Sequence, residues 1–232
     1  KVTYSKMADD IVDTLGELKG AVMKIGQIAS QTQDLLPKEI SEALQKLQKE
    51  APAVEFNVIR QQVENDFSQD LEVLFSAFDE QPYAAASIGQ VHRAVTKAGE
   101  EVVVKVQYPG VDRSCDSDLK QLKLTLKLGG LLKMPKKSVD ALFDEIKERI
   151  HEELDYELEA KNLKKFSEFH KDDDSVLVPK VINNLSSKKV LTLEYLPGDH
   201  IEDLSAQNYS TETINALGRS LFTLLAEQLF VF

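Results

Sequence analysis

Residues 84–107 read AAASIGQVHRAVTKAGEEVVVKVQ, and this stretch decides the fold. Apolar and β-branched residues fill Ile88 to Val95 and again Val102 to Gln107, and Lys97-Ala98-Gly99 between them has the composition of a turn. The pattern predicts a β-hairpin. Because the valines at 102–104 are continuous rather than alternating, we expect the second strand to be covered on both faces.

The hairpin carries two features of a polyphosphate-binding site. Small residues lead into its first strand, so that backbone N–H groups are able to approach phosphates closely. Lys105 ends the valine run, where a kinase places the lysine that reaches the α- and β-phosphates. An ordinary tight hairpin and an exposed strand-end lysine are the alternatives. The predicted nucleotide loop comprises Ala84, Ala85, Ala86, Ser87, Ile88, Gly89 and Gln90.

A long helix is predicted downstream, with Ser138 as its cap and its end at the charged residues 171–174. Apolar residues that step by four predict the buried stripe of this helix. They are Leu142, Ile146, Ile150, Leu154 and Leu158.

The same predicted helix carries the acidic run EELDYELE at residues 152–159. Asp155 and Glu159 would lie on one face, and Glu153 with Glu157 on a neighbouring stripe. A buried Lys105 needs a carboxylate partner, because a buried unpaired charge is strongly unfavourable. This run is the candidate source of that partner; a solvated acidic face is the alternative.

The remaining segments are mostly helical. Helical spacing of apolar residues covers residues 5–50, where Lys24 and Gln27 share one face of a helix rich in small residues, a pattern that helix packing alone also explains. Further helices are predicted from the cap Asn57 to Phe67, at 112–132 and at 211–229, and a second hairpin pairs 178–182 with 189–195. Segregated strands and helices indicate an α+β fold.

Composition excludes several classes of protein. The 232 residues carry 28 Lys and Arg against 39 Asp and Glu, for a net charge of -11, which argues against a general nucleic-acid binder. Cys115 is the only cysteine, so no internal disulfide forms. No apolar run reaches the roughly 18 residues of a membrane span. The histidines have no metal-ligand spacing and are expected at the surface or in caps: His92, His151, His170 and His200.

Four motifs, taken together, resemble the UbiB family in order and spacing over about residues 7–232. They are Lys-x-Gly-Gln at 24–27, the alanine-rich run at 84–92, Val-Val-Val-Lys-Val-Gln-Tyr-Pro-Gly-Val at 102–111, and Glu-x-Asp-Tyr at 153–156 followed by Glu159. The resemblance implies a protein-kinase-like small lobe of antiparallel sheet and long helix. We expect an N-terminal helical extension at 1–52, this lobe at 53–196, and the start of a helical large lobe at 197–232.

The resemblance also implies the roles of individual residues. Lys105 would pair with Glu159, and the helix of Lys24 and Gln27 would lie over the mouth of the site, facing Glu153 and Asp155. The alanine-rich run would form the nucleotide loop, and Glu194 to Leu196 the hinge that holds adenine.

The activity that the resemblance implies is that of an atypical kinase or ATPase supporting ubiquinone (coenzyme Q) biosynthesis. Its cofactors would be ATP and Mg²⁺, and its partners coenzyme Q biosynthesis proteins and a lipid membrane, in the cytoplasm or the mitochondrial matrix. The catalytic Asp and the Mg²⁺ ligands are expected after residue 232, so we expect this chain alone to bind nucleotide without turning it over. A non-catalytic regulatory or scaffolding module and an isoprenoid-lipid-binding helical protein are the alternatives.

Overall fold

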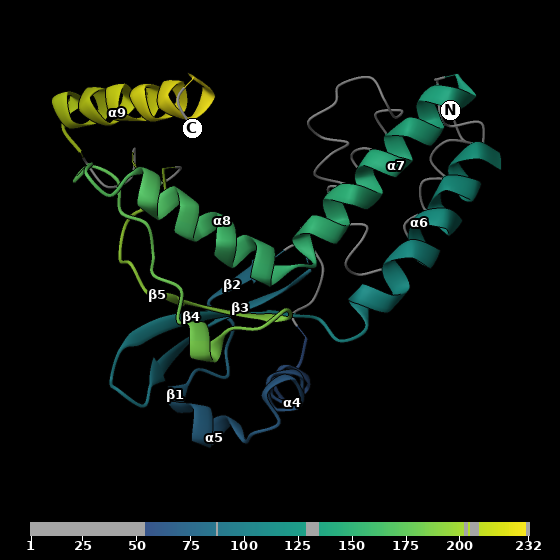
Figure 1. The fold of residues 1–232 in the computed structure, drawn as a ribbon, viewed down its shortest axis with the longest axis horizontal. Helices are drawn as coiled ribbons and strands as arrows, with labels where there is room; N and C mark the ends of the chain where they lie inside the picture. The colour runs from purple at the N-terminus through teal and green to yellow at the C-terminus, as the bar shows by residue number, and fades with distance from the viewer. Residues whose placement is uncertain (1–53, 87, 129–134, 202–203, 205–208, 231–232) are drawn as a thin grey trace.

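A five-stranded antiparallel sheet lies between helices on its two faces (Figure 1). The computed structural model describes residues 54–86, 88–128, 135–201, 204 and 209–230. Its strands follow the order β1-β3-β4-β5, and β2 also pairs with β3. The bounds are Phe75–Phe78 for β1, Ala84–Ala86 for β2, Gly89–Thr96 for β3, Glu101–Gln107 for β4 and Val190–Glu194 for β5. The predicted α+β class is confirmed.

The β3–β4 hairpin is confirmed, with Gly99 at its turn in the left-handed region (φ +86°) that glycine favours. The expectation that β4 is covered on both faces holds only in part. Val102, Val104 and Val106 are buried, whereas Val103 and Lys105 on the opposite face are only half-buried. The strand therefore alternates between an apolar core face and a second face that carries Lys105.

The core face of the sheet packs against α4, Phe56–Phe67, and the short α5, Leu71–Leu74 (Figure 1). Ile59 and Val63 of α4 are fully buried in one cluster with the β4 valines. Helix α4 confirms the predicted element, but its N-cap is Glu55 rather than Asn57. This helix and the valines give the lobe its hydrophobic core.

The predicted long helix is wrong, because it is two helices: α7, Lys136–Glu153, and α8, Tyr156–Phe169. Asp155 breaks the run by capping α8, since its Oδ1 accepts a hydrogen bond of 3.0 Å from the backbone N–H of Leu158. The break changes the helical register. Leu154 remains buried, whereas Leu158 is 38% exposed, not packed in the core as predicted. The N-cap of α7 is Pro135, not Ser138.

Helices α6, Val111–Leu128, and α7 lie side by side and extend away from the sheet, while α8 crosses the Lys105 face (Figure 1). The last helix is α9, Thr211–Phe230, close to its predicted bounds. The predicted second hairpin forms only in part. Its first strand is reduced to one bridge between Val181 and Leu193, followed by the 3-10 helix η1, Asn183–Leu185.

Gly89 offers a direct test of this sheet geometry. A Cβ atom at this position would lie 2.1 Å from the carbonyl oxygen of Val106 on the paired strand. Because backbone cannot yield as a flexible side chain does, Gly89→Ala should lower the free energy of unfolding by about 3 kcal/mol or more. Urea denaturation measures this change.

Gly198→Ala is the matched control, because nothing lies within 4 Å of a Cβ atom there. We expect its midpoint to stay close to that of the parent protein. Equal stability of the Gly89→Ala and Gly198→Ala proteins would contradict the close strand approach at Gly89.

Candidate functional site

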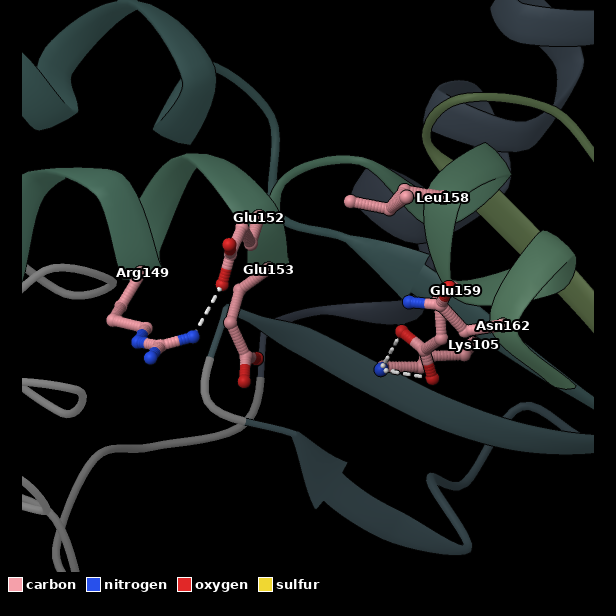
Figure 2. A pocket seen from close by; sticks show the side chains of 7 residues that line it. All are labelled: Lys105, Arg149, Glu152, Glu153, Leu158, Glu159 and Asn162. Atoms are coloured by element: carbon pink, nitrogen blue, oxygen red, sulfur yellow. Dashed lines mark hydrogen bonds and ion pairs between the residues drawn. The ribbon is translucent and has the colours of Figure 1, made fainter. Parts of the chain in front are cut away.

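The centre of the candidate site is an ion pair between β4 and α8. Lys105 Nζ lies 2.9 Å from Oε1 and 2.7 Å from Oε2 of Glu159, so that the ammonium group contacts both carboxylate oxygens (Figure 2). The side chains are 20% and 37% exposed, which leaves the pair within reach of a ligand. The predicted partner of Lys105 is thus the one present in the structure.

Tyr156 forms the floor beneath Lys105. The ammonium nitrogen lies 4.6 Å from the centre of the phenol ring, in a cation–π contact. The side chain is fully buried, and burial, reinforced by the charges of Glu159 and Glu153, raises the pKa of its hydroxyl. Sequence analysis missed this role of Tyr156; the signal was an aromatic residue at the centre of the acidic run.

A cavity of about 670 Å³ opens beside the ion pair (Figure 2). Both α7 and α8 contribute acidic groups to it, and Arg149 of α7 bonds Glu152 at 3.0 Å. Its charged and polar walls suit a ligand that carries both charge and hydrogen-bonding groups. The lining residues are Lys105, Arg149, Glu152, Glu153, Leu158, Glu159 and Asn162.

The predicted acids therefore divide between two tasks. Glu153 and Glu159 line the cavity with Lys105, whereas Asp155 uses its carboxylate to cap α8. Lys24, Gln27 and Ser87 lie outside the described residues, so their predicted places at the site stay predictions.

The predicted nucleotide loop lies at the edge of the sheet. Ala86 pairs with Gly89, which makes residues 84–91 a tight hairpin, and Val91 lies directly opposite Lys105. Gln90 is buried on the core face, where its Oε1 accepts from the backbone N–H of Val54. The Gln90 side chain is therefore not placed where a ligand could reach it, contrary to its predicted role in the loop.

The predicted hinge begins at Glu194, the last residue of β5. Glu194 pairs with Val102, three residues along β4 from Lys105, which corresponds to about 10 Å along the strand. The backbone N–H groups of Glu194 and Tyr195 donate to the carbonyls of Lys180 and Glu101, so Leu196 supplies the next N–H group along the chain.

One of the four histidines, His92, differs from the expectation of surface or capping residues, whereas His151 and His200 are exposed and His170 is a cap. His92 is fully buried, and His170 is buried at the C-cap of α8. Within the described residues, His170, Asp173 and Glu227 bring possible ligand atoms to within 4.8 Å of one another. Two of these groups are partly exposed carboxylates, a common arrangement at protein surfaces, and we assign no ion to them.

His92 joins a buried polar network on the core face. Its Nδ1 lies 2.9 Å from the carbonyl oxygen of Asp79, and its Nε2 lies 3.3 Å from Gln90 Nε2. Since a carbonyl only accepts, Nδ1 carries the proton and Nε2 accepts from the amide. Burial lowers the pKa of His92, because the charged form loses its solvation.

Comparison with known proteins identifies the family. Residues 46–232 match the model of the ABC1 atypical kinase-like domain. The chain belongs to the ABC1 atypical kinase-like family. This result confirms the resemblance to the UbiB family and the kinase-like assignment of the fold.

Individual relatives agree with this assignment. The atypical kinase coq-8, mitochondrial, of Caenorhabditis elegans is 40% identical over 84% of this chain and 26% of its own length. The atypical kinase COQ8, mitochondrial, of Saccharomyces cerevisiae is 35% identical over 97% and 44%. The chain therefore spans less than half the length of these curated relatives.

A solved structure supports the same fold. The Mycobacterium tuberculosis protein Rv3197, determined in complex with erythromycin, is 35% identical, with a TM-score of 0.58 over 90% of this chain and 52% of its own.

The strength of the central ion pair is measurable by a double-mutant cycle. Both side chains keep contact with solvent, so we expect a coupling free energy between Lys105→Met and Glu159→Gln of about 0.5–1 kcal/mol in unfolding experiments. Glu157→Gln, on the exposed side of α8, is the control and should show no coupling to Lys105→Met. Coupling as small as that of the control would contradict the pairing.

His92 predicts a pH dependence of stability. Its pKa is lower in the folded protein than the usual 6.5, so the unfolded chain binds more protons as pH falls below neutrality. The contribution of His92 to the free energy of unfolding is therefore complete above pH 6.5. It is lost as pH falls through the pKa of the folded protein, by at most about 1.4 kcal/mol per pH unit.

Urea denaturation at pH 7.5 and 5.5 measures this loss. His92→Asn retains a donor for Asp79 but does not titrate, so its loss should be smaller than that of the parent protein. The exposed His200→Asn should behave like the parent. The same loss in all three proteins would exclude His92 as the cause.

Proposed function

We propose that this lobe binds ATP or ADP, with the phosphates at Lys105 and the alanine-rich hairpin and the adenine at Glu194 to Leu196. The observation that carries the proposal is the Lys105–Glu159 pair, because a lysine on this strand paired with a helix glutamate is the phosphate-orienting arrangement of protein kinases. Residues 89–91 of this hairpin lie on β3, the strand paired with that of Lys105, and residues 84–86 pair with them on β2; the small residues of the turn would leave room for phosphates to approach the backbone.

Phosphoryl transfer also requires Mg²⁺ and a catalytic aspartate. Lys105 and the hairpin backbone suit the phosphates of a nucleotide, but they are donors and cannot hold the metal. The carboxylates of Glu153 and Glu159 line the same cavity, and Glu159 is already engaged with Lys105. We therefore propose that residues outside this chain hold Mg²⁺, and that this chain alone binds nucleotide without hydrolysing it.

In the whole protein, we propose an atypical kinase or ATPase activity that supports ubiquinone biosynthesis, acting with other proteins of that pathway at an organellar membrane. The support is family membership and relatives named COQ8 and mitochondrial. Within the part of the chain that the structure describes, no helix is both long and apolar enough to cross a bilayer.

Thermal unfolding with ATP and ADP, with and without Mg²⁺, tests nucleotide binding. At a nucleotide concentration 100 times Kd, binding stabilises the folded state by about 2.7 kcal/mol. For a chain of this size, that corresponds to a rise in melting temperature of roughly 5–10 °C. Lys105→Ala should abolish the rise.

The matched control is Lys97→Ala, which removes a lysine from the turn at the far end of the same hairpin. It should retain the full shift. A parent protein that shows no shift at millimolar nucleotide, or a Lys105→Ala variant that responds like Lys97→Ala, would overturn the proposed site.

The regulatory alternative makes a different prediction for the longer protein. A scaffold would bind nucleotide through the same lobe but would not hydrolyse it, whereas the proposed enzyme hydrolyses ATP and loses that activity in Lys105→Ala. The intact ion pair argues only against a lobe that binds a partner protein without nucleotide, because such a lobe has no need of a lysine in contact with both oxygens of Glu159.

A further inference from the structure

We infer that Gln107 is the positioning residue that sets α8, and with it Glu159, against Lys105. The inference rests on the proposed nucleotide site and identifies how that site is held in shape. Gln107 lies two residues beyond Lys105 on β4, so both side chains extend from the same face of the sheet. Unlike Lys105, Gln107 is only 2% exposed.

The buried amide of Gln107 holds the junction between α7 and α8. Its Nε2 donates to the carbonyl oxygen of Leu154 at 2.9 Å and to that of Lys188 at 3.2 Å. Leu154 is the C-cap of α7, and α8 begins two residues later. Strand β4 therefore makes two contacts with this region. Lys105 binds Glu159 in the first turn of α8, and Gln107 binds the chain immediately before that turn.

The second acceptor connects a third element. The carbonyl of Lys188 also accepts from the backbone N–H of Tyr156 at 3.2 Å, and the backbone N–H of Gln107 donates to Lys189 at 3.0 Å. One carbonyl thus joins the β4 side chain, the first residue of α8 and the segment that leads into β5. Tyr156, held in this way, is also the residue whose ring lies under Lys105.

The chemistry of the side chain is specific. Two hydrogen bonds from a single NH₂ group to two carbonyls require an amide donor, which no apolar or acidic residue of the same length provides. Glutamate at this position would place a negative charge against two carbonyl oxygens, which repel it. Methionine keeps the length and buried volume of glutamine but loses both bonds, so Gln107→Met removes the positioning function at a modest packing cost.

The test is a double-mutant cycle on nucleotide affinity, measured by isothermal titration calorimetry with ADP. Gln107→Met should weaken binding about tenfold, as expected for losing the alignment of a ligand-binding group. If Gln107 acts through Glu159, the double variant with Glu159→Gln should bind no more weakly than Glu159→Gln alone. The exposed Gln61→Met on α4 is the control and should bind like the parent.

A second measurement separates failure of this inference from failure of the proposed function. Glu159 holds Lys105, so acetylation of Lys105 by a small amine-reactive reagent should be slow in the parent and in Gln61→Met. Mass spectrometry measures the rate. Acetylation should accelerate several-fold in both Glu159→Gln and Gln107→Met. This readout reports the ion pair without any nucleotide, whereas a merely structural role would lower stability without exposing Lys105 selectively.

The outcomes are distinct. If the parent does not bind ADP but Gln107→Met still releases Lys105, the positioning role stands and the proposed function fails. If Gln107→Met retains both the parent affinity and the slow acetylation of Lys105, or if its effect multiplies that of Glu159→Gln, the positioning role is overturned.

Discussion

The structure depends on how a positive charge is kept on a strand whose other face forms the hydrophobic core. Lys105 lies between two buried valines of β4, and its ammonium group is only partly solvated. Such a charge is tolerated only with a close counter-ion, and Glu159 provides it through both carboxylate oxygens. Because Glu159 belongs to α8, the ion pair also holds this helix over the Lys105 face of the sheet.

The start of α8 is the second constraint, and it follows from Asp155. In a continuous helix from 136 to 169, Glu159 would keep the register of α7. Its side chain would then extend in a different direction from the one that brings it to Lys105. The cap at Asp155 ends that register and begins a new one, with Tyr156 buried and Glu159 directed to Lys105. The exposed Leu158 is a consequence, because the residue that continued the old stripe now lies on a different side.

Much of this arrangement could be predicted from the sequence. The hairpin and the helix over 56–67 follow from patterning, and the need of Lys105 for an acid from the run at 152–159 follows from the cost of an unpaired charge. The choice of Glu159 within that run came from the resemblance to the UbiB family. The helix break could not be predicted in the same way, because apolar residues spaced four apart continue through it. Asp is also common both as a helix cap and on a solvated helix face. The two side-chain contacts of Gln107 are with residues that lie 47 and 81 positions further along the chain, Leu154 and Lys188. No local sequence pattern encodes such tertiary contacts.

The two faces of the sheet explain why the polar residues of β3 and β4 divide as they do. Gln90 and His92 alternate onto the core face, where each is satisfied by a neighbouring polar group and neither is available to a ligand. Lys105 and Gln107 alternate onto the α8 face, where one side chain meets the ligand-accessible cavity and the other is buried against carbonyls. A shift of one residue in the register of β4 against β3 would move the alternating residues of β4 to opposite faces, placing Lys105 in the core and valines at the cavity. At the end of the hairpin a Cβ atom in the place of Gly89 would lie 2.1 Å from the carbonyl oxygen of Val106, so a shift that brought any other residue to this place would be opposed, and a residue without a side chain helps to determine which side chains form the site.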